Sequence, residues 1–527
     1  MLITRRQPAR AADDGTTAVI RFPMRKRVYL ETFGCQMNVL DSELVLGQLR
    51  AQGYEQTSDR STADVVIFNT CSVREHAEQK VWSRLGELRQ AKADRPGLVV
   101  GVIGCMAERE GTSLFGRFPH VDILCGPGEL DKLPAMVHNA VLTSDPAARG
   151  PDAAAPPVRP AARQVALMGA AVRRSATYDA AREDTLELLD LSRSVSPGDG
   201  MRQAYVRITR GCNKFCTYCV VPYTRGPEVH RPPENIVDEV RMLVDAGAVE
   251  VTLLGQTINH YAYAHGDGRT TTFADLLYRV HEATPELPRL RFVTSYPRDF
   301  TDAALQAMRD CPRICRYLHV PAQSGSDRIL KAMNRGYTAG QYLDFVERAR
   351  AMMPDVSLAS DFIVGFPTET DDDFAATAAL VRRCWFKNSF IFKYSPRPGT
   401  VAIDRFADDV PDAVKRRRNN ELLAIQTEIC AQNNAAMIGR EVEVYVEGES
   451  KLMSKRAAYP ASNVELGWAR PAANPPDETQ LVGRTRGDQV VCFDGSRELI
   501  GRLLNVRVTD ARNLTLFGVP VLENAPA

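Results

Sequence analysis

Strand-like and helix-like segments alternate along most of this chain of 527 residues, and that alternation constrains the fold more than any other feature. In the N-terminal part the expected strands are residues 28–33, 65–69 and 98–103. The expected helices cover 41–52 and 75–91, and a third begins at 107–109. Alternating strands and helices of this length form a parallel sheet with helices on its faces. The N-terminal part is therefore predicted to be a parallel α/β sheet domain.

A second alternating series starts at Gln203. Its expected strands are residues 203–208, 249–254, 290–295, 316–320, 356–364 and 388–394. Its expected helices lie near 234–246, 273–283, 301–309, 340–352 and 370–384. Six strand–helix units predict a partial, open version of the parallel barrel, which places its functional site at the carboxyl ends of the strands.

The C-terminal part has shorter strands separated by glycine-containing turns. The expected strands are 442–446, 489–493 and 504–508, after a long helix over 415–434. This pattern predicts a small β-barrel, used either for binding or only for packing. The predicted division of the chain is a disordered N-terminus (1–25), an N-terminal domain (26–141), an Ala/Pro-rich linker (142–200), a central barrel (201–436) and a C-terminal barrel (437–519) with an insertion near 451–480.

Cys212, Cys216 and Cys219 follow the first strand of the second series with the spacing C-x3-C-x2-C. Three thiolates in one loop can face one metal centre, and a cubane iron–sulfur cluster normally takes four cysteines. Three ligands would leave one iron open to a substrate or cofactor. One alternative is a zinc site, but zinc needs a fourth ligand and the nearest histidine is His230; unrelated thiols are the other. The chain has 12 cysteines and we expect no export signal, which favours metal or redox use over disulfides.

Cys35, Cys71 and Cys105 each follow a predicted strand of the N-terminal domain by two residues. All three are therefore expected at the carboxyl edge of one sheet, where open α/β folds bind their ligands. Thiols separated by 36 and 34 residues along the chain could then converge in space. The alternative is that each is a small buried residue. Three more cysteines fit no ligand spacing and are expected to be structural: Cys311, Cys315 and Cys384.

Residues 211–226, GCNKFCTYCVVPYTRG, resemble the methylthiotransferases, one branch of the radical S-adenosylmethionine superfamily. The segments GCQMN (34–38), LHVPAQSGSDRILKAMNRGYT (318–338) and YSPRPGT (394–400) resemble the same family. Within it, the chain is most similar to the enzymes that modify isopentenylated adenosine in tRNA. The resemblance implies a (β/α)6 barrel for the central domain and a TRAM domain, an RNA-binding module, for the C-terminal barrel.

The resemblance also implies an activity and its cofactors. Enzymes of this kind methylthiolate C2 of N6-isopentenyladenosine next to the anticodon, with two 4Fe–4S clusters and S-adenosyl-L-methionine. By resemblance, Cys212, Cys216 and Cys219 hold the cluster that binds S-adenosylmethionine, and Cys35, Cys71 and Cys105 hold an auxiliary cluster. Tyr218 of the cysteine loop is expected to contact S-adenosylmethionine, as are four polar residues at the strand ends: Gln256, Asn259, Ser295 and Gln323. Arg225 is expected to face the base or the cofactor.

Two kinds of alternative function stay open at this point. Sister enzymes of the same class modify threonylcarbamoyl-adenosine in tRNA or an aspartate of a ribosomal protein, although GCQMN and VVPYTRG (220–226) favour the isopentenyladenosine enzymes. The other alternative is a non-catalytic iron–sulfur protein that binds RNA. The chain departs from the family pattern at His230, where a serine is expected, and at Thr257, where an asparagine is expected. Neither is expected to touch a cysteine ligand.

The expected partners are tRNA, bound through its anticodon stem–loop, an unidentified electron donor and an unidentified sulfur source. No run of about 18 apolar residues is present, so we expect no membrane span. We also expect the protein to be cytoplasmic and monomeric. The net charge of +1 argues against a globally basic nucleic-acid binder. RNA contact would then depend on local patches such as 25–27 and 415–418, although a short charge run is also typical of a solvated helix face.

Overall fold

The structure is a computed structural model and describes residues 26–72, 75–144, 163–168, 185–193, 195, 202–450, 478–512 and 514–521. The predicted disordered N-terminus (1–25) lies outside the described residues, as do most of the linker (142–200) and most of the insertion (451–480). Over the described part, no helix combines the length and the apolar character that a membrane crossing requires.

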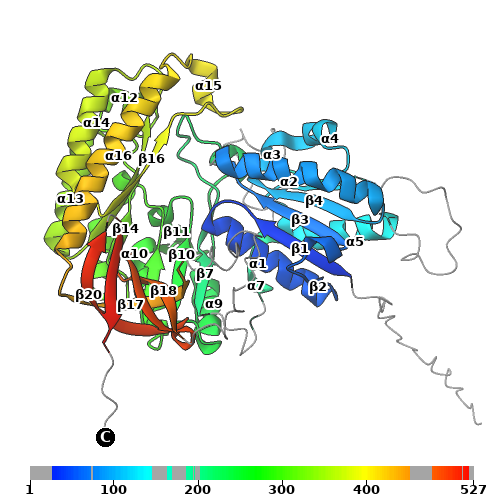
Figure 1. Cartoon of the computed structure of the whole chain (residues 1–527), viewed down its shortest axis with the longest axis horizontal. Helices are drawn as coiled ribbons and strands as arrows, with labels where there is room; N and C mark the ends of the chain where they lie inside the picture. The colour runs from blue at the N-terminus through cyan, green and yellow to red at the C-terminus, as the bar shows by residue number, and fades with distance from the viewer. Residues whose placement is uncertain are drawn as a thin grey trace, which may run out of the picture.

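The N-terminal domain is a parallel sheet with helices on both faces (Figure 1). Its six strands pair in the order β2-β1-β3-β4-β5-β6. The strands are β1 (Arg27–Thr32), β2 (Glu55–Gln56), β3 (Val65–Thr70), β4 (Val99–Gly104), β5 (Ile123–Cys125) and β6 (Gln164–Ala166). The helices are α1 (Gln36–Ala51), α2 (Glu75–Asp94), α3 (Cys105–Glu110), α4 (Leu114–Arg117) and α5 (Leu133–Ser144). Helices α1 and α5 pack on one face and α2 to α4 on the other, so the predicted α/β fold is confirmed.

Two elements fall within the region that the sequence predicted as a linker. One is β6, which extends the sheet by pairing with β5. The other is α7 (Thr185–Leu191), whose Leu189 is fully buried in the core of the N-terminal domain. The described parts of the Ala/Pro-rich region are therefore folded against the sheet, because a ladder of backbone hydrogen bonds and one apolar side chain find partners there.

The central domain has the six parallel strands that the sequence predicted, arranged as an open barrel. They pair as β13-β10-β7 and β14-β15-β16, and a parallel bridge between Leu290 and Ile314 lies between the two sets. The strands are β7 (Gln203–Arg207), β10 (Glu250–Leu254), β13 (Arg289–Phe292), β14 (Tyr317–His319), β15 (Ser357–Val364) and β16 (Asn388–Lys393). The outer helices are α9 (Pro233–Asp245), α10 (Phe273–Ala283), α11 (Asp302–Asp310), α13 (Ala339–Met352) and α14 (Asp371–Cys384).

Local sequence explains where three of these helices begin. Thr272, Thr338 and Thr370 each accept a hydrogen bond from the backbone three residues later, and the side chain at that position returns one. Such capping boxes satisfy backbone N–H groups that would otherwise lack partners. Smaller elements decorate the barrel: β8 (Thr209–Arg210) paired with β9 (Val229–His230), the hairpin β11 (Ala262–Ala264) and β12 (Thr270–Thr272), α8 (Val221–Thr224), α12 (Asp327–Ala332) and α15 (Val401–Arg405).

The C-terminal domain is a closed five-stranded barrel in the order β17-β18-β19-β21-β20, as predicted. Its strands are β17 (Glu441–Glu449), β18 (Glu478–Thr485), β19 (Val490–Ser496), β20 (Leu503–Arg512) and β21 (Thr515–Pro520), and α16 (Asp412–Ala435) leads into it. Arg289, the first residue of β13, donates hydrogen bonds to the carbonyl oxygens of Glu443 (2.8 Å) and Arg484 (2.9 Å). The small barrel is thus attached at the amino ends of the central strands.

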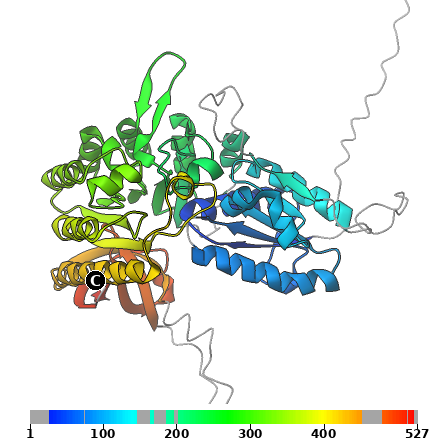
Figure 2. The same ribbon diagram turned by 90° about the horizontal axis from the view of Figure 1, so that it is seen from above.

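A buried ion network joins the N-terminal domain to the central barrel, which lie side by side in both views (Figures 1 and 2). Arg207 of β7 pairs with Asp41 of α1 at 2.7 Å and with Asp190 of α7 at 2.6 Å, and each of these side chains is 1% exposed. Arg225 pairs with the same Asp41 at 2.9 Å. Because removing one member of a buried pair leaves an uncompensated charge, this network fixes how the two domains meet.

Candidate functional site

The three N-terminal cysteines lie at the carboxyl ends of neighbouring strands. Cys35 follows β1 and precedes α1, Cys71 follows β3, and Cys105 is the first residue of α3 directly after β4. A hydrogen bond with Cys71, together with the charge of Arg225, lowers the pKa of the Cys35 thiol to about 6. Burial raises the pKa of the Cys105 thiol, and the charges of the nearby Arg225 and Cys35 shift this pKa in opposite directions. The fold therefore brings Cys35, Cys71 and Cys105 together, as the sequence predicted.

Two glycines and a buried amide network allow this convergence. Gly34 has φ +134°, and a Cβ there would lie 2.3 Å from the Cβ of Cys71; Gly104 has φ +90°, and a Cβ there would lie 2.6 Å from the carbonyl oxygen of Thr70. Asn38 donates hydrogen bonds to the Asn69 side chain and to the Thr70 carbonyl, both at 2.9 Å. The backbone before two of the cysteines can thus approach more closely than any side chain would permit.

The second triad lies in the loop between β8 and α8. Burial and the nearby thiols of Cys216 and Cys212 raise the pKa of Cys219, so the three sulfur atoms are close neighbours. Each thiol has a polar neighbour: Cys212 Sγ lies 3.5 Å from Thr257 Oγ1, Arg335 reaches Cys216 Sγ at 3.5 Å, and the backbone N–H of Val221 donates to Cys219 Sγ at 3.4 Å. The backbone of Lys214 also hydrogen-bonds to Cys212. The expectation that Thr257 would not touch a cysteine is wrong, because its hydroxyl group contacts Cys212.

Arg335 is a site residue that the sequence argument missed. Its side chain is buried, reaches the Tyr218 hydroxyl at 3.5 Å as well as Cys216, and lies 4.5 Å from the centre of the Tyr296 ring. A buried guanidinium against a thiol supplies positive charge where a thiolate would form. The only sequence signal was its place in the family-like segment 318–338, which did not single it out.

Three of the five residues expected to bind S-adenosylmethionine carry a buried polar atom with no hydrogen-bond partner in the described part of the chain. These atoms are Gln256 Oε1, Ser295 Oγ and Gln323 Oε1, all just beyond the carboxyl ends of barrel strands. Gln323 also has φ +70°, a backbone conformation that is costly for a non-glycine residue. Buried polar groups are normally paired, so unpaired ones at the barrel mouth fit a polar ligand bound there.

The other two expected cofactor contacts are engaged within the protein. Asn259 accepts from the backbone N–H of Tyr296 at 2.7 Å and donates to its carbonyl oxygen at 2.9 Å, so both ends of its amide hold the Tyr296 turn. Tyr218 packs against an apolar cluster that includes Ile329 and Phe366, and burial raises the pKa of its hydroxyl group. Their contact with a cofactor remains a prediction.

Helix α8 links the two triads. Cys219 precedes it, and Arg225 follows it and hydrogen-bonds to Asn38 (3.3 Å), to Asp41 (2.9 Å) and to the Cys105 thiol. Helix α8 contacts α3, the helix that Cys105 begins, so the two triads approach each other at the domain boundary. Arg225 thus points toward the N-terminal cysteines, a contact that the sequence did not predict.

All four residues of the basic segment 415–418 form ion pairs with acidic side chains. Arg418 pairs with Glu369 at 2.7 Å, Arg417 with Asp371 at 2.8 Å and Arg416 with Asp412 at 2.8 Å. Lys415 pairs with Asp408 at 2.5 Å. These pairs neutralise the segment, so it is a poor candidate for binding RNA phosphates.

Comparisons with known proteins cover all three domains. Residues 27–126 match the uncharacterized protein family UPF0004, residues 206–381 the radical SAM superfamily, and residues 473–521 the TRAM domain. A tRNA-2-methylthio-N(6)-dimethylallyladenosine synthase of Rhodopirellula baltica is 45% identical over 94% of this chain and 95% of its own length. The proteins of the same name from Moorella thermoacetica and Neisseria gonorrhoeae are 40% and 39% identical, each over 94% of this chain and over 98% and 99% of their own lengths.

Proposed function

This chain belongs to the family of the tRNA-2-methylthio-N(6)-dimethylallyladenosine synthases, and we propose that its two cysteine triads carry the clusters on which that reaction depends. The protein is a radical S-adenosylmethionine methylthiotransferase that modifies tRNA, adding a methylthio group at C2 of N6-isopentenyladenosine. It uses two 4Fe–4S clusters and S-adenosylmethionine.

The observation that supports the proposal is the convergence of two separate sets of three thiols on either side of α8. In our assignment, Cys212, Cys216 and Cys219 hold the cluster whose fourth iron binds S-adenosylmethionine, and Cys35, Cys71 and Cys105 hold the auxiliary cluster. When bound, these groups supply the radical that removes hydrogen from C2 and the sulfur and methyl group that replace it.

The residues of the chain then have positioning and shielding roles. Arg335 places positive charge against Cys216, and Gln256, Ser295 and Gln323 offer unpaired polar atoms to S-adenosylmethionine. Arg225 places positive charge against Cys105 while holding Asp41. These assignments rest on contacts and burial, and each can be tested by substitution.

We further propose that the substrate is the anticodon stem–loop. A base in a single-stranded loop can leave its stack without breaking a pair, which a buried site at a barrel mouth requires. The five-stranded barrel would hold the stem by its phosphates. We expect the enzyme to act as a cytoplasmic monomer, with an electron donor and a sulfur source supplied by other molecules.

Two single variants separate the roles of the triads. Cys212→Ala is expected to abolish 5′-deoxyadenosine formation from S-adenosylmethionine. Cys71→Ala is expected to retain it but to form no methylthio product. Loss of 5′-deoxyadenosine in the Cys71 variant, or normal methylthiolation by it, contradicts the assignment.

Mass spectrometry of tRNA nucleosides tests the substrate. A deletion strain should accumulate isopentenyladenosine without the methylthio group, and the wild-type chain should restore the group. Restoration of methylthio-threonylcarbamoyl-adenosine in its place would identify the sister activity.

A further inference from the structure

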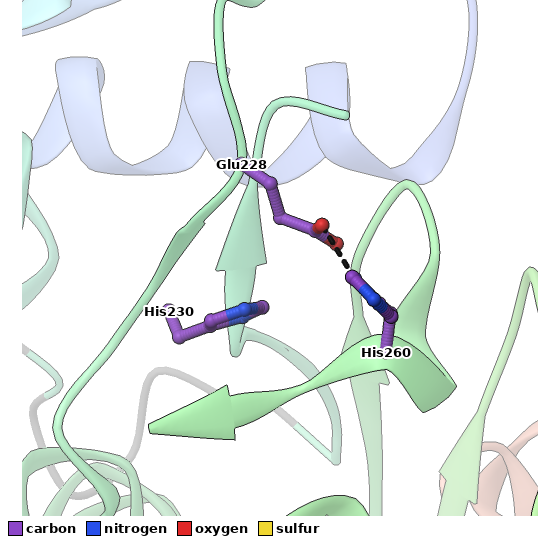
Figure 3. Close-up of side chains that lie close together, drawn as sticks. All are labelled: Glu228, His230 and His260. Carbon is purple, nitrogen blue, oxygen red and sulfur yellow. Dashed lines mark hydrogen bonds and ion pairs between the residues drawn. The ribbon is translucent and has the colours of Figure 1, made fainter. Parts of the chain in front are cut away.

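A second cluster of potential ligands lies beside the barrel mouth and shares no residue with the cysteine triads. It consists of Glu228, His230 and His260, and one possible ligand atom from each lies within 4.8 Å of the others. Figure 3 shows the three side chains gathered together, Glu228 and His230 from one extended segment and His260 from another. Glu228 precedes β9, His230 ends β9, and His260 ends the turn of residues Ile258–His260.

The loop of the second triad holds this cluster in place. The backbone N–H of Glu228 donates to the Asn213 side chain at 3.1 Å, and Asn213 directly follows Cys212. The backbone N–H of His260 donates to the carbonyl oxygen of Thr257 at 3.1 Å, and the Thr257 hydroxyl group contacts Cys212. Asn213 and Thr257 thus connect the cluster to Cys212 and so to the proposed cofactor site.

The polar atoms of the cluster are only partly used. Glu228 Oε2 accepts from His260 Nδ1 at 2.6 Å, whereas Glu228 Oε1 and His230 Nδ1 are buried and have no hydrogen-bond partner among the described residues. The Glu228 side chain is 2% exposed. A buried carboxylate oxygen and a buried ring nitrogen that both lack partners are costly unless a ligand satisfies them.

We propose that Glu228, His230 and His260 bind a divalent transition-metal ion such as Zn2+. Two imidazoles and one carboxylate form a ligand set that zinc accepts, with a solvent molecule completing four-coordination. Zinc–ligand bonds of about 2.0–2.1 Å place tetrahedral ligand atoms about 3.3 Å apart. The present separations of up to 4.8 Å therefore need to contract by about 1.5 Å, which side-chain rotations can provide.

The metal ion would replace the hydrogen bond between His260 and Glu228, and it would give the unpaired ring nitrogen of His230 a partner. His260 is 42% exposed at its side chain, so the open coordination position would be reachable from solvent. The ion would tie β9 to the turn before β11 and so brace the loop that carries Cys212.

The test uses the full-length protein with both iron–sulfur clusters in place, so that free cysteines do not take up zinc. Zinc bound per chain is measured by equilibrium dialysis and elemental analysis for wild type, for the double variant His230→Ser/His260→Ala, and for His265→Ala. His265 is a matched control because it lies in the β11–β12 hairpin, which projects from the barrel (Figure 2), and bonds to Thr271 at 2.8 Å. Iron content and circular dichroism report whether each variant is folded.

We expect one zinc per chain in wild type and in the His265 variant, and affinity weakened by more than about 100-fold in the double variant. X-ray absorption at the zinc edge should show nitrogen and oxygen neighbours at about 2.0–2.1 Å and no sulfur at about 2.3 Å. Equal zinc affinity in all three folded proteins, no bound zinc in wild type, or a sulfur shell would each overturn the proposal. None of these readouts depends on tRNA modification, so the zinc proposal can fail while the proposed activity stands.

Discussion

Arg225 offers a direct test of how the domain boundary supports the N-terminal cysteines. Its guanidinium is 7% exposed at the side chain, pairs with Asp41 at 2.9 Å and hydrogen-bonds to the Cys105 thiol. A cluster held by thiolates gathers negative charge in a buried place, where a hydrogen-bonded cation is worth about 1.5–3 kcal/mol. Arg225→Ala removes that cation. Asp41 is not left unpaired by the change, because Arg207 still holds it at 2.7 Å.

That energy corresponds to a cluster retained about 10- to 150-fold less tightly. The assay is iron and sulfide per chain against chelator concentration, in a background with Cys212, Cys216 and Cys219 replaced by alanine, so that only the auxiliary cluster is counted. Arg225→Lys is the control: it keeps the charge but loses the fork geometry, and should fall between the parent and the alanine variant. If the alanine variant and the parent release iron at the same chelator concentration, Arg225 does not support the cluster.

Three further outcomes follow from the described contacts. Asp190→Asn should destabilise the fold by about 3–5 kcal/mol in urea unfolding, whereas exposed Asp238→Asn should change stability little. Burial alone would raise the pKa of Asp190, but neighbouring arginines hold it well below its usual range. Its contribution to stability is therefore full above the unfolded pKa of about 3.9 and is lost as the pH falls further; the Asn variant should lack this acid-sensitive part. Gln323→Ala should raise the Kd for S-adenosylmethionine about 10-fold in calorimetry, with unchanged iron content. Gly104→Ala should lower the iron content of the N-terminal domain, because its Cβ would lie 2.6 Å from the Thr70 carbonyl oxygen at φ +90°.

The parts of the site that could be predicted from sequence are those set by strand periodicity. Cys35, Cys71 and Cys105 each follow a strand of one sheet, and parallel strands end at one edge, so their convergence follows from the pattern alone. The strand-end residues Ser295 and Gln323 were found by the same reasoning.

Contacts between distant segments could not be predicted in this way. Arg335 reaches Cys216 across 119 residues, and Thr257 reaches Cys212 across 45. Neither contact is marked by a sequence pattern, because the distance between the two residues depends on how the barrel strands are arranged in space. Likewise, a composition rich in alanine and proline does not predict that β6 and α7 pack on the N-terminal sheet. Only a few side chains of this region, such as Leu189, are buried in the core.

If the small barrel holds the RNA stem as proposed, its place of attachment sets a minimum size for the substrate. Arg289 and Ser357 open their strands and bind the five-stranded barrel, whereas the cysteines lie beyond the opposite strand ends. Strands of four to eight residues separate the two regions by about 13–27 Å. A free nucleoside cannot bridge such a gap. On that proposal, an RNA would run along the outside of the central domain, and the length of the central strands would set how far the held stem lies from the base to be modified.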